Sequence, residues 1–124
     1  MRFAGIDFGW GGQPSGLCLL EAERSGLELK RLDRLAELTE ILKWVDEWVG
    51  PGPAIVAIDA PAIIPHQSGM RTPDRLAHRL FGRYHAGCYP ANLGRPWAAR
   101  TLALAQALAS RGFAHGDRIE PRAP

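Results

Sequence analysis

Two aspartates, Asp7 and Asp59, each follow a short apolar run in this 124-residue chain. The runs are FAGIDFGWGG at residues 3–12 and AIVAIDAP at residues 54–61. A carboxylate at the end of a buried strand stays ionised if it is paired, hydrated or bound to a metal. Mg²⁺ prefers oxygen ligands, so two such carboxylates side by side could hold divalent ions. The alternative is that each aspartate only caps the turn that follows it.

The segment around Asp7 predicts three strands in an antiparallel meander. Residues 2–8 have the pattern of a buried strand, and the glycines and proline of residues 9–14 form a turn. Residues 15–21 and 27–32 predict two further strands. Their short connections favour antiparallel pairing.

A helix is predicted next, with Asp33 capping its start and Gly50 ending it. One face carries apolar residues at helical spacing: Leu38, Ile41, Leu42, Val45 and Val49. Residues 54–58 are apolar at every position, which predicts a strand covered on both faces. A right-handed crossover would place this strand parallel to the first. Asp7 and Asp59 would then be neighbours at the carboxyl ends, where open α/β sheets bind ligands.

The second half of the chain predicts a loop at residues 60–69, a helix from Thr72, a loop at residues 85–95, and a last helix from Pro96 to Gly112. Thr72 is the expected N-cap of the first of these helices. Its expected buried side consists of Leu76, Ala77, Leu80 and Phe81. Another side carries a basic stripe of Arg71, Arg75, Arg79 and Arg83. The stripe predicts binding of substrate phosphates, or else a solvated face in which Arg71 pairs locally with Asp74.

Composition is that of one globular domain, assigned to residues 1–112, with a tail at residues 113–124 in which no complete element is predicted. The chain is 46% hydrophobic and 23% charged, and its net charge of +2 permits nucleic acid as a partner. No apolar run is long enough to span a membrane, so no membrane association is expected. Cys18 and Cys88 form no disulfide framework or zinc pattern, so a reducing, cytoplasmic setting is predicted. The spacing of His66, His78 and His85 does not suggest a zinc site either.

The motifs GIDFGWGG, PSGLCLLE, AIDAP, GMRTPDRLAHRLFGRYHAGCYPANLGRP and RGF together resemble the N-terminal part of the domain of unknown function 429 family. That family is described as predicted nucleases of the ribonuclease H-like superfamily. The resemblance implies a ribonuclease H-like α/β fold, with three antiparallel strands, a helix, a parallel strand and further helices. Family members usually continue into another strand, beginning near RIEPRAP, and a C-terminal helix with an acidic residue.

The resemblance also implies hydrolysis of phosphodiester bonds in nucleic acid by two metal ions, Mg²⁺ or Mn²⁺, held by Asp7 and Asp59. Such enzymes generally use three or four carboxylates. On the first helix Glu40 and Glu47 lie opposite the apolar face, so neither is expected at the site. Activity of this chain by itself is therefore a separate prediction.

Two alternatives remain open. The chain could be a truncated, non-catalytic relative that binds or associates, for example as a homodimer through an uncovered sheet. It could also be a phosphate-binding domain related to sugar kinases and actin-like ATPases, whose Asp-x-Gly turn Asp7-Phe8-Gly9 matches loosely. Trp10 in the same turn either stacks on a base or covers the edge of a core.

Overall fold

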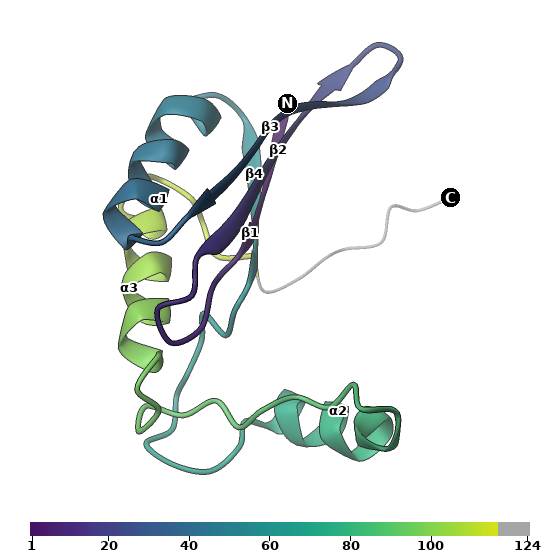
Figure 1. The fold of residues 1–124 in the computed structure, drawn as a ribbon, viewed down its shortest axis with the longest axis vertical. Helices are drawn as coiled ribbons and strands as arrows, with labels where there is room; N and C mark the ends of the chain where they lie inside the picture. The colour runs from purple at the N-terminus through teal and green to yellow at the C-terminus, as the bar shows by residue number, and fades with distance from the viewer. Residues whose placement is uncertain (117–124) are drawn as a thin grey trace.

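The computed structural model describes residues 1–116 and contains a four-stranded sheet with helices packed on one side of it (Figure 1). The strands are β1 (Arg2–Asp7), β2 (Ser15–Glu23), β3 (Gly26–Leu35) and β4 (Ala54–Asp59). The helices are α1 (Leu38–Trp44), α2 (Thr72–Phe81) and α3 (Ala98–Ala109). A π-helical turn, η1 (Val45–Val49), extends α1, and a 3-10 turn, η2 (Gly82–Tyr84), follows α2. None of the helices in this part of the chain is long and apolar enough to cross a membrane.

The sheet has the order β3-β2-β1-β4, in which β1, β2 and β3 pair antiparallel and β4 pairs parallel with β1. This confirms the predicted mixed α/β architecture. The hairpin of β2 and β3 is longer than the apolar pattern indicated. Its polar end is paired, since Lys30 Nζ lies 2.6 Å from a Glu28 oxygen and 3.3 Å from a Glu23 oxygen.

The core lies between one face of the sheet and the helices α1 and α3, and we call this face the helix face. Side chains of alternate strand residues pack there against the helices: Ala4, Ile6, Leu17 and Leu19 against Ile41, Val45, Val49, Leu104 and Leu108.

The prediction that Asp33 caps the first helix was wrong, because β3 continues past Asp33. Glu37 is the N-cap residue and forms a capping box with Glu40, whereas Asp33 accepts a hydrogen bond from Trp44 Nε1 at 2.7 Å.

The opposite face of the sheet, which we call the open face, is not covered by a helix within residues 1–116 (Figure 1). The prediction that β4 is covered on both faces was therefore wrong. Its residues alternate between half-buried and exposed, and Ile55 is 51% exposed. Because β4 is also the last strand of the described sheet, one of its edges is unpaired among these residues.

Helix α2 lies beyond the carboxyl ends of β1 and β4 and projects to the side of the sheet away from α1 and α3 (Figure 1). The predicted buried side of this helix is exposed, with Leu80 at 53%, because no described element packs on it. The buried residue of α2 is instead Asp74. Thr72 is the first helical residue, and Arg71 occupies the N-cap position without capping through its side chain.

The C-terminal helix α3 begins two residues after Pro96 and ends before Gly112, close to the prediction. Phe113 packs against the core, and residues 113–116 form neither helix nor strand. The predicted start of a strand in the tail falls mainly on residues 117–124, which lie outside the described residues.

Candidate functional site

Asp7 and Asp59 lie directly opposite each other at the ends of β1 and β4, as predicted. Adjacent strands are about 4.8 Å apart, so the two residues are nearest neighbours across the sheet. Ile6 and Ile58, which precede them, pack on the helix face, so the alternation of strand side chains puts both carboxylates on the open face. Both aspartates are exposed. The fold thus brings two acidic groups together on one accessible surface.

A shallow hollow of about 600 Å³ adjoins both aspartates on the open face. Its floor is made of small residues, including Gly5, Gly16 and Ala57. A side chain added at Gly5 would meet nothing within 4 Å, and one at Gly16 would meet Asp7 Cβ at 3.8 Å. Close packing therefore does not require glycine at these two positions. Their effect is to leave space beside the carboxylates.

The turn after Asp7 is closed tightly on itself. The amide of Gly9 donates a hydrogen bond to Ser15 Oγ at 3.1 Å, and a Cβ at Gly9 would lie 2.0 Å from the Gln13 carbonyl oxygen. Because the Gly9 amide already has a partner, it is not free to wrap a phosphate. This weakens the comparison with the Asp-x-Gly turn of sugar kinases.

Arg100 of α3 holds the same turn, a role that the sequence did not indicate. Its guanidinium donates to the carbonyl oxygen of Gly9 at 3.1 Å and to that of Ala36, just before α1. It also lies over the ring of Phe8. One side chain thereby ties the turn after Asp7 to the start of α1. Nothing in its helical spacing distinguishes it from a solvated arginine.

The first helix does not supply a third carboxylate to the open face, because α1 packs on the helix face. Glu37 and Glu40 cap α1, and Asp46 forms an ion pair with Arg111 at 2.6 Å. Within residues 1–116 there is no cluster of three or more His, Cys, Asp or Glu side chains that could hold a metal ion. Two carboxylates nevertheless suit Mg²⁺, which commonly uses one or two in addition to water and substrate phosphates.

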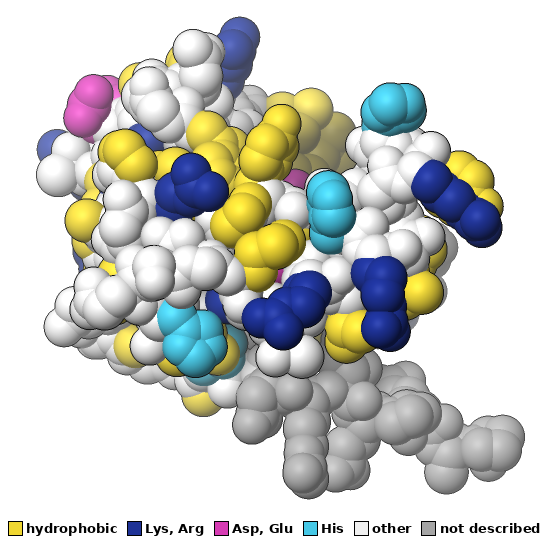
Figure 2. Space-filling view, turned by 90° about the horizontal axis from the view of Figure 1, so that it is seen from below, with side chains coloured by type: hydrophobic (Ala, Val, Ile, Leu, Met, Phe, Trp, Pro, Cys, Tyr) yellow, Lys and Arg dark blue, Asp and Glu magenta, His cyan; other side chains and the backbone are white. Residues whose placement is uncertain are grey.

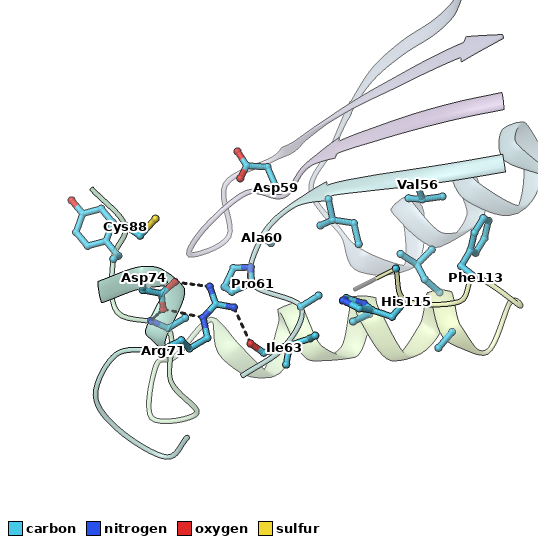
Figure 3. A pocket seen from close by; sticks show the side chains of 18 of the residues that line it. Val56, Asp59, Ala60, Pro61, Ile63, Arg71, Asp74, Cys88, Phe113 and His115 are labelled. Atoms are coloured by element: carbon cyan, nitrogen blue, oxygen red, sulfur yellow. Dashed lines mark hydrogen bonds and ion pairs between the residues drawn. The ribbon is translucent and has the colours of Figure 1, made fainter. Parts of the chain in front are cut away.

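A second cleft, of about 720 Å³, lies between the end of β4, α3 and the segment around Cys88 (Figure 3). Asp59 is also part of its lining, together with His115. Its wall contains an ion pair in which Arg71 donates to both oxygens of Asp74, at 2.9 and 2.6 Å. Arg71 also donates to the carbonyl oxygen of Ile63. A guanidinium held in this way is not free to bind a phosphate.

Of the predicted basic stripe, Arg75 and Arg79 on α2 and Arg83 after it are exposed, whereas Arg71 is held by Asp74. Arg83 lies in η2 with its guanidinium 4.6 Å from the ring centre of Tyr84. Figure 2 shows the end of the molecule below the sheet, where arginine and histidine side chains alternate with apolar ones.

Trp10 is half-exposed and packs edge-on against Trp97, with the ring centres 4.4 Å apart, so it covers the edge of a small core cluster.

Asp74 is 2% exposed and fixes the segment that we call the α2 arm, residues 62–96. In addition to the Arg71 guanidinium, its carboxylate accepts a hydrogen bond from the amide of Ala91 at 3.2 Å. Arg71 above all, and then the Ala91 amide, lower the pKa of Asp74 below its ordinary value of 3.8, although burial opposes the shift.

The lowered pKa predicts that the α2 arm loosens in acid. A carboxyl group with a depressed folded pKa stabilises the structure fully above its unfolded pKa of 3.8, and this stabilisation is lost as the pH falls through the folded pKa. Titration by NMR from about pH 7 to 2 should move the Ala91 amide resonance with a midpoint below 3.8. A midpoint at or above the ordinary value would contradict the assignment.

In a comparison with protein families, the model of a family described as "Protein of unknown function (DUF429)" matches residues 5–123. The searches of curated proteins and of solved structures gave no match.

Proposed function

The chain belongs to the DUF429 family, and from this premise we propose that it is a metal-dependent nuclease-like domain that hydrolyses phosphodiester bonds in nucleic acid. The observation that carries the proposal is the juxtaposition of Asp7 and Asp59 on adjacent parallel strands. Both side chains are on the open face, beside a hollow that admits a ligand.

The chain's own residues would act by position and charge. Asp7 and Asp59 would hold Mg²⁺ or Mn²⁺, which when bound supplies an activated water and stabilises the leaving oxygen. Gly5 and Gly16 would let a phosphodiester approach the strand backbones closely. Arg75 and Arg79 on α2 would contact phosphates further along the nucleic acid, because α2 projects on the same side of the sheet as the open face (Figure 1).

A cleavage assay tests this proposal. Purified protein with Mg²⁺ or Mn²⁺ should cut at least one of single-stranded, duplex, hybrid or branched nucleic acids, and EDTA should stop the reaction. If the protein cuts none of the four kinds of nucleic acid, the proposal is contradicted. Hydrolysis of ATP that nucleic acid does not affect would favour a phosphate-binding domain related to sugar kinases instead.

A second candidate function, association with another copy of the chain, is favoured by the apolar character of the open face. Pairing register places Leu27, Leu29 and Leu32 of β3 on this face, as it does Ile55 of β4, which is in the same row as Leu29. All four are more than half exposed. Contiguous apolar surface of this kind is typical of an interface. A homodimer through these residues would also cover part of the hollow beside Asp7, because Leu32 lines it.

Leu29→Lys should convert such a dimer to a monomer, because a lysine at this position would be buried against the partner without a counter-charge. Sedimentation equilibrium of the wild type and the variant measures the change. Leu80→Lys on α2 is the matched control, since Leu80 is as exposed as Leu29 but lies off the sheet. A wild-type protein that remains monomeric at high concentration would contradict the homodimer.

A further inference from the structure

Arg34 of β3 occupies the same row across the sheet as the two aspartates. Asp59 pairs with Asp7, Asp7 with Gly16, and Gly16 with Arg34. Residues directly opposite each other on paired strands have their side chains on the same face. The row Asp59, Asp7, Gly16, Arg34 therefore presents two acids, a gap and a base along one line of the open face.

The gap has a size suited to a small anionic group. With strands about 4.8 Å apart, the backbone of Arg34 is about 10 Å from that of Asp7. Gly16 lies between them and contributes no side chain. Gly16 is part of the lining of the hollow beside the aspartates, which continues over Gly5 and Ala57 and reaches β3 at Leu32 and Asp33, next to Arg34 in the chain.

Arg34 differs from the other charged residues near it on β3. Arg31 and Asp33 pair with each other on the helix face, and Asp33 also binds Trp44 Nε1. The side chain of Arg34 is exposed and forms no ion pair or hydrogen bond with another side chain or backbone group among residues 1–116, although its backbone pairs with Gly16 in the sheet. An arginine side chain without a protein partner, in the same row as two carboxylates and separated from them by a glycine, suits a negatively charged ligand whose oxygens can also bind a metal ion.

We propose that Arg34 is a substrate-binding residue that holds a phosphate of nucleic acid over Gly16, while the adjacent phosphodiester lies at Asp7 and Asp59. This inference rests on the proposed nuclease function. The planar guanidinium can donate two parallel hydrogen bonds to phosphate oxygens, which gives orientation as well as attraction. The open face, rather than the cleft that contains the Arg71 pair, is then the surface on which the substrate lies.

Binding of a fluorescein-labelled single-stranded oligonucleotide, measured by anisotropy with Ca²⁺ in place of Mg²⁺, tests the assignment. Arg34→Gln should weaken binding about tenfold or more, the usual effect of losing hydrogen bonds to a charged group. Arg34→Lys should recover part of this loss, since it keeps the charge but not the paired donors. Arg24→Gln is the matched control: it removes the same charge from the turn at the far end of the hairpin, and its effect should be small.

Gly16→Val supplies a second test that does not touch a charge. Valine suits a strand, and the space above Gly16 accommodates its side chain, so the melting temperature should not fall. The side chain would fill the gap, and oligonucleotide binding should be lost at least as fully as in Arg34→Gln.

The outcomes separate this inference from the proposed function. Cleavage by the wild type, with KM and affinity unchanged in both Arg34→Gln and Gly16→Val, would overturn the role of Arg34 while leaving the nuclease proposal intact. Binding that depends on Arg34, in a protein that cuts none of the nucleic acids, would support Arg34 as a nucleic-acid contact and contradict the nuclease proposal. An equal loss in Arg24→Gln would overturn the inference, since general charge would then explain the effect.

Discussion

Asp7→Asn is expected to abolish metal-dependent cleavage of nucleic acid. Asparagine keeps the shape of the side chain but removes the charge that a divalent cation requires at this position. Mutation of residues that merely support metal ligands commonly costs about 10- to 100-fold in affinity or activity, so loss of a direct ligand should cost about 100-fold or more in kcat. Titration calorimetry with Mn²⁺ should show a matching loss of metal binding. Because Asp7 is exposed, the melting temperature should change little.

The control for this experiment is Glu47→Gln. Glu47 lies in η1, which packs on the helix face and not near the aspartates. This variant should cut as the wild type does, and Asp59→Asn should behave like Asp7→Asn. Full activity in Asp7→Asn would exclude this pair of carboxylates as the catalytic centre. Loss of activity in Glu47→Gln would indicate that the first helix supplies a third metal ligand.

Asp74→Ala is expected to open the α2 arm without unfolding the sheet. The substitution leaves the Arg71 guanidinium and the Ala91 amide without their common acceptor. Unpaired groups of this kind cost about 2 kcal/mol or more when they are removed from water. Since no residue of the arm belongs to the core between the sheet and the helices α1 and α3, the loss should appear as local opening. Hydrogen exchange of residues 62–96 should accelerate about 30-fold, while exchange in β1 should stay unchanged.

Asp46→Ala is a matched control, because Asp46 also accepts two hydrogen bonds from one arginine, Arg111. That pair is exposed to solvent, and exposed pairs contribute little to stability. The variant should therefore leave exchange in the arm as it is in the wild type. Equal effects of the two substitutions, or unfolding of β1 in Asp74→Ala, would show that burial of the Asp74 pair is not what fixes the arm.

The order of the strands and the pairing of the aspartates could be predicted because each depends on local patterns. Short turns after Asp7 and after Glu23 leave room for antiparallel hairpins alone, and a helix before β4 favours a parallel return. Once β1 and β4 are neighbours, the equal positions of Asp7 and Asp59 in their apolar runs set them side by side.

The environment of α2 could not be predicted in this way. The spacing of Leu76 and Leu80 correctly indicates an amphipathic helix, but an apolar stripe does not say what covers it. Nor does helical spacing separate Arg71, which is committed to a buried carboxylate, from Arg75, which is exposed. The position of Arg34 in the same row as the aspartates could not be predicted for a similar reason. Its position beside the aspartates depends on the register of β2 and β3, which includes a bulge that no sequence pattern marks.

The pairing of β1 with β4 has a consequence for how this site can change in evolution. A substitution near Asp59 leaves the carboxylate where it is. The stretch from the Arg2↔Ala54 pair to the Asp7↔Asp59 pair, however, must contain the same number of residues on β1 as on β4. A single insertion or deletion within β4 would turn Asp59 from the open face to the helix face, towards the apolar side chains packed there. Among homologues, gaps in an alignment should therefore collect in the loops on either side of β4 and be excluded from the strand itself.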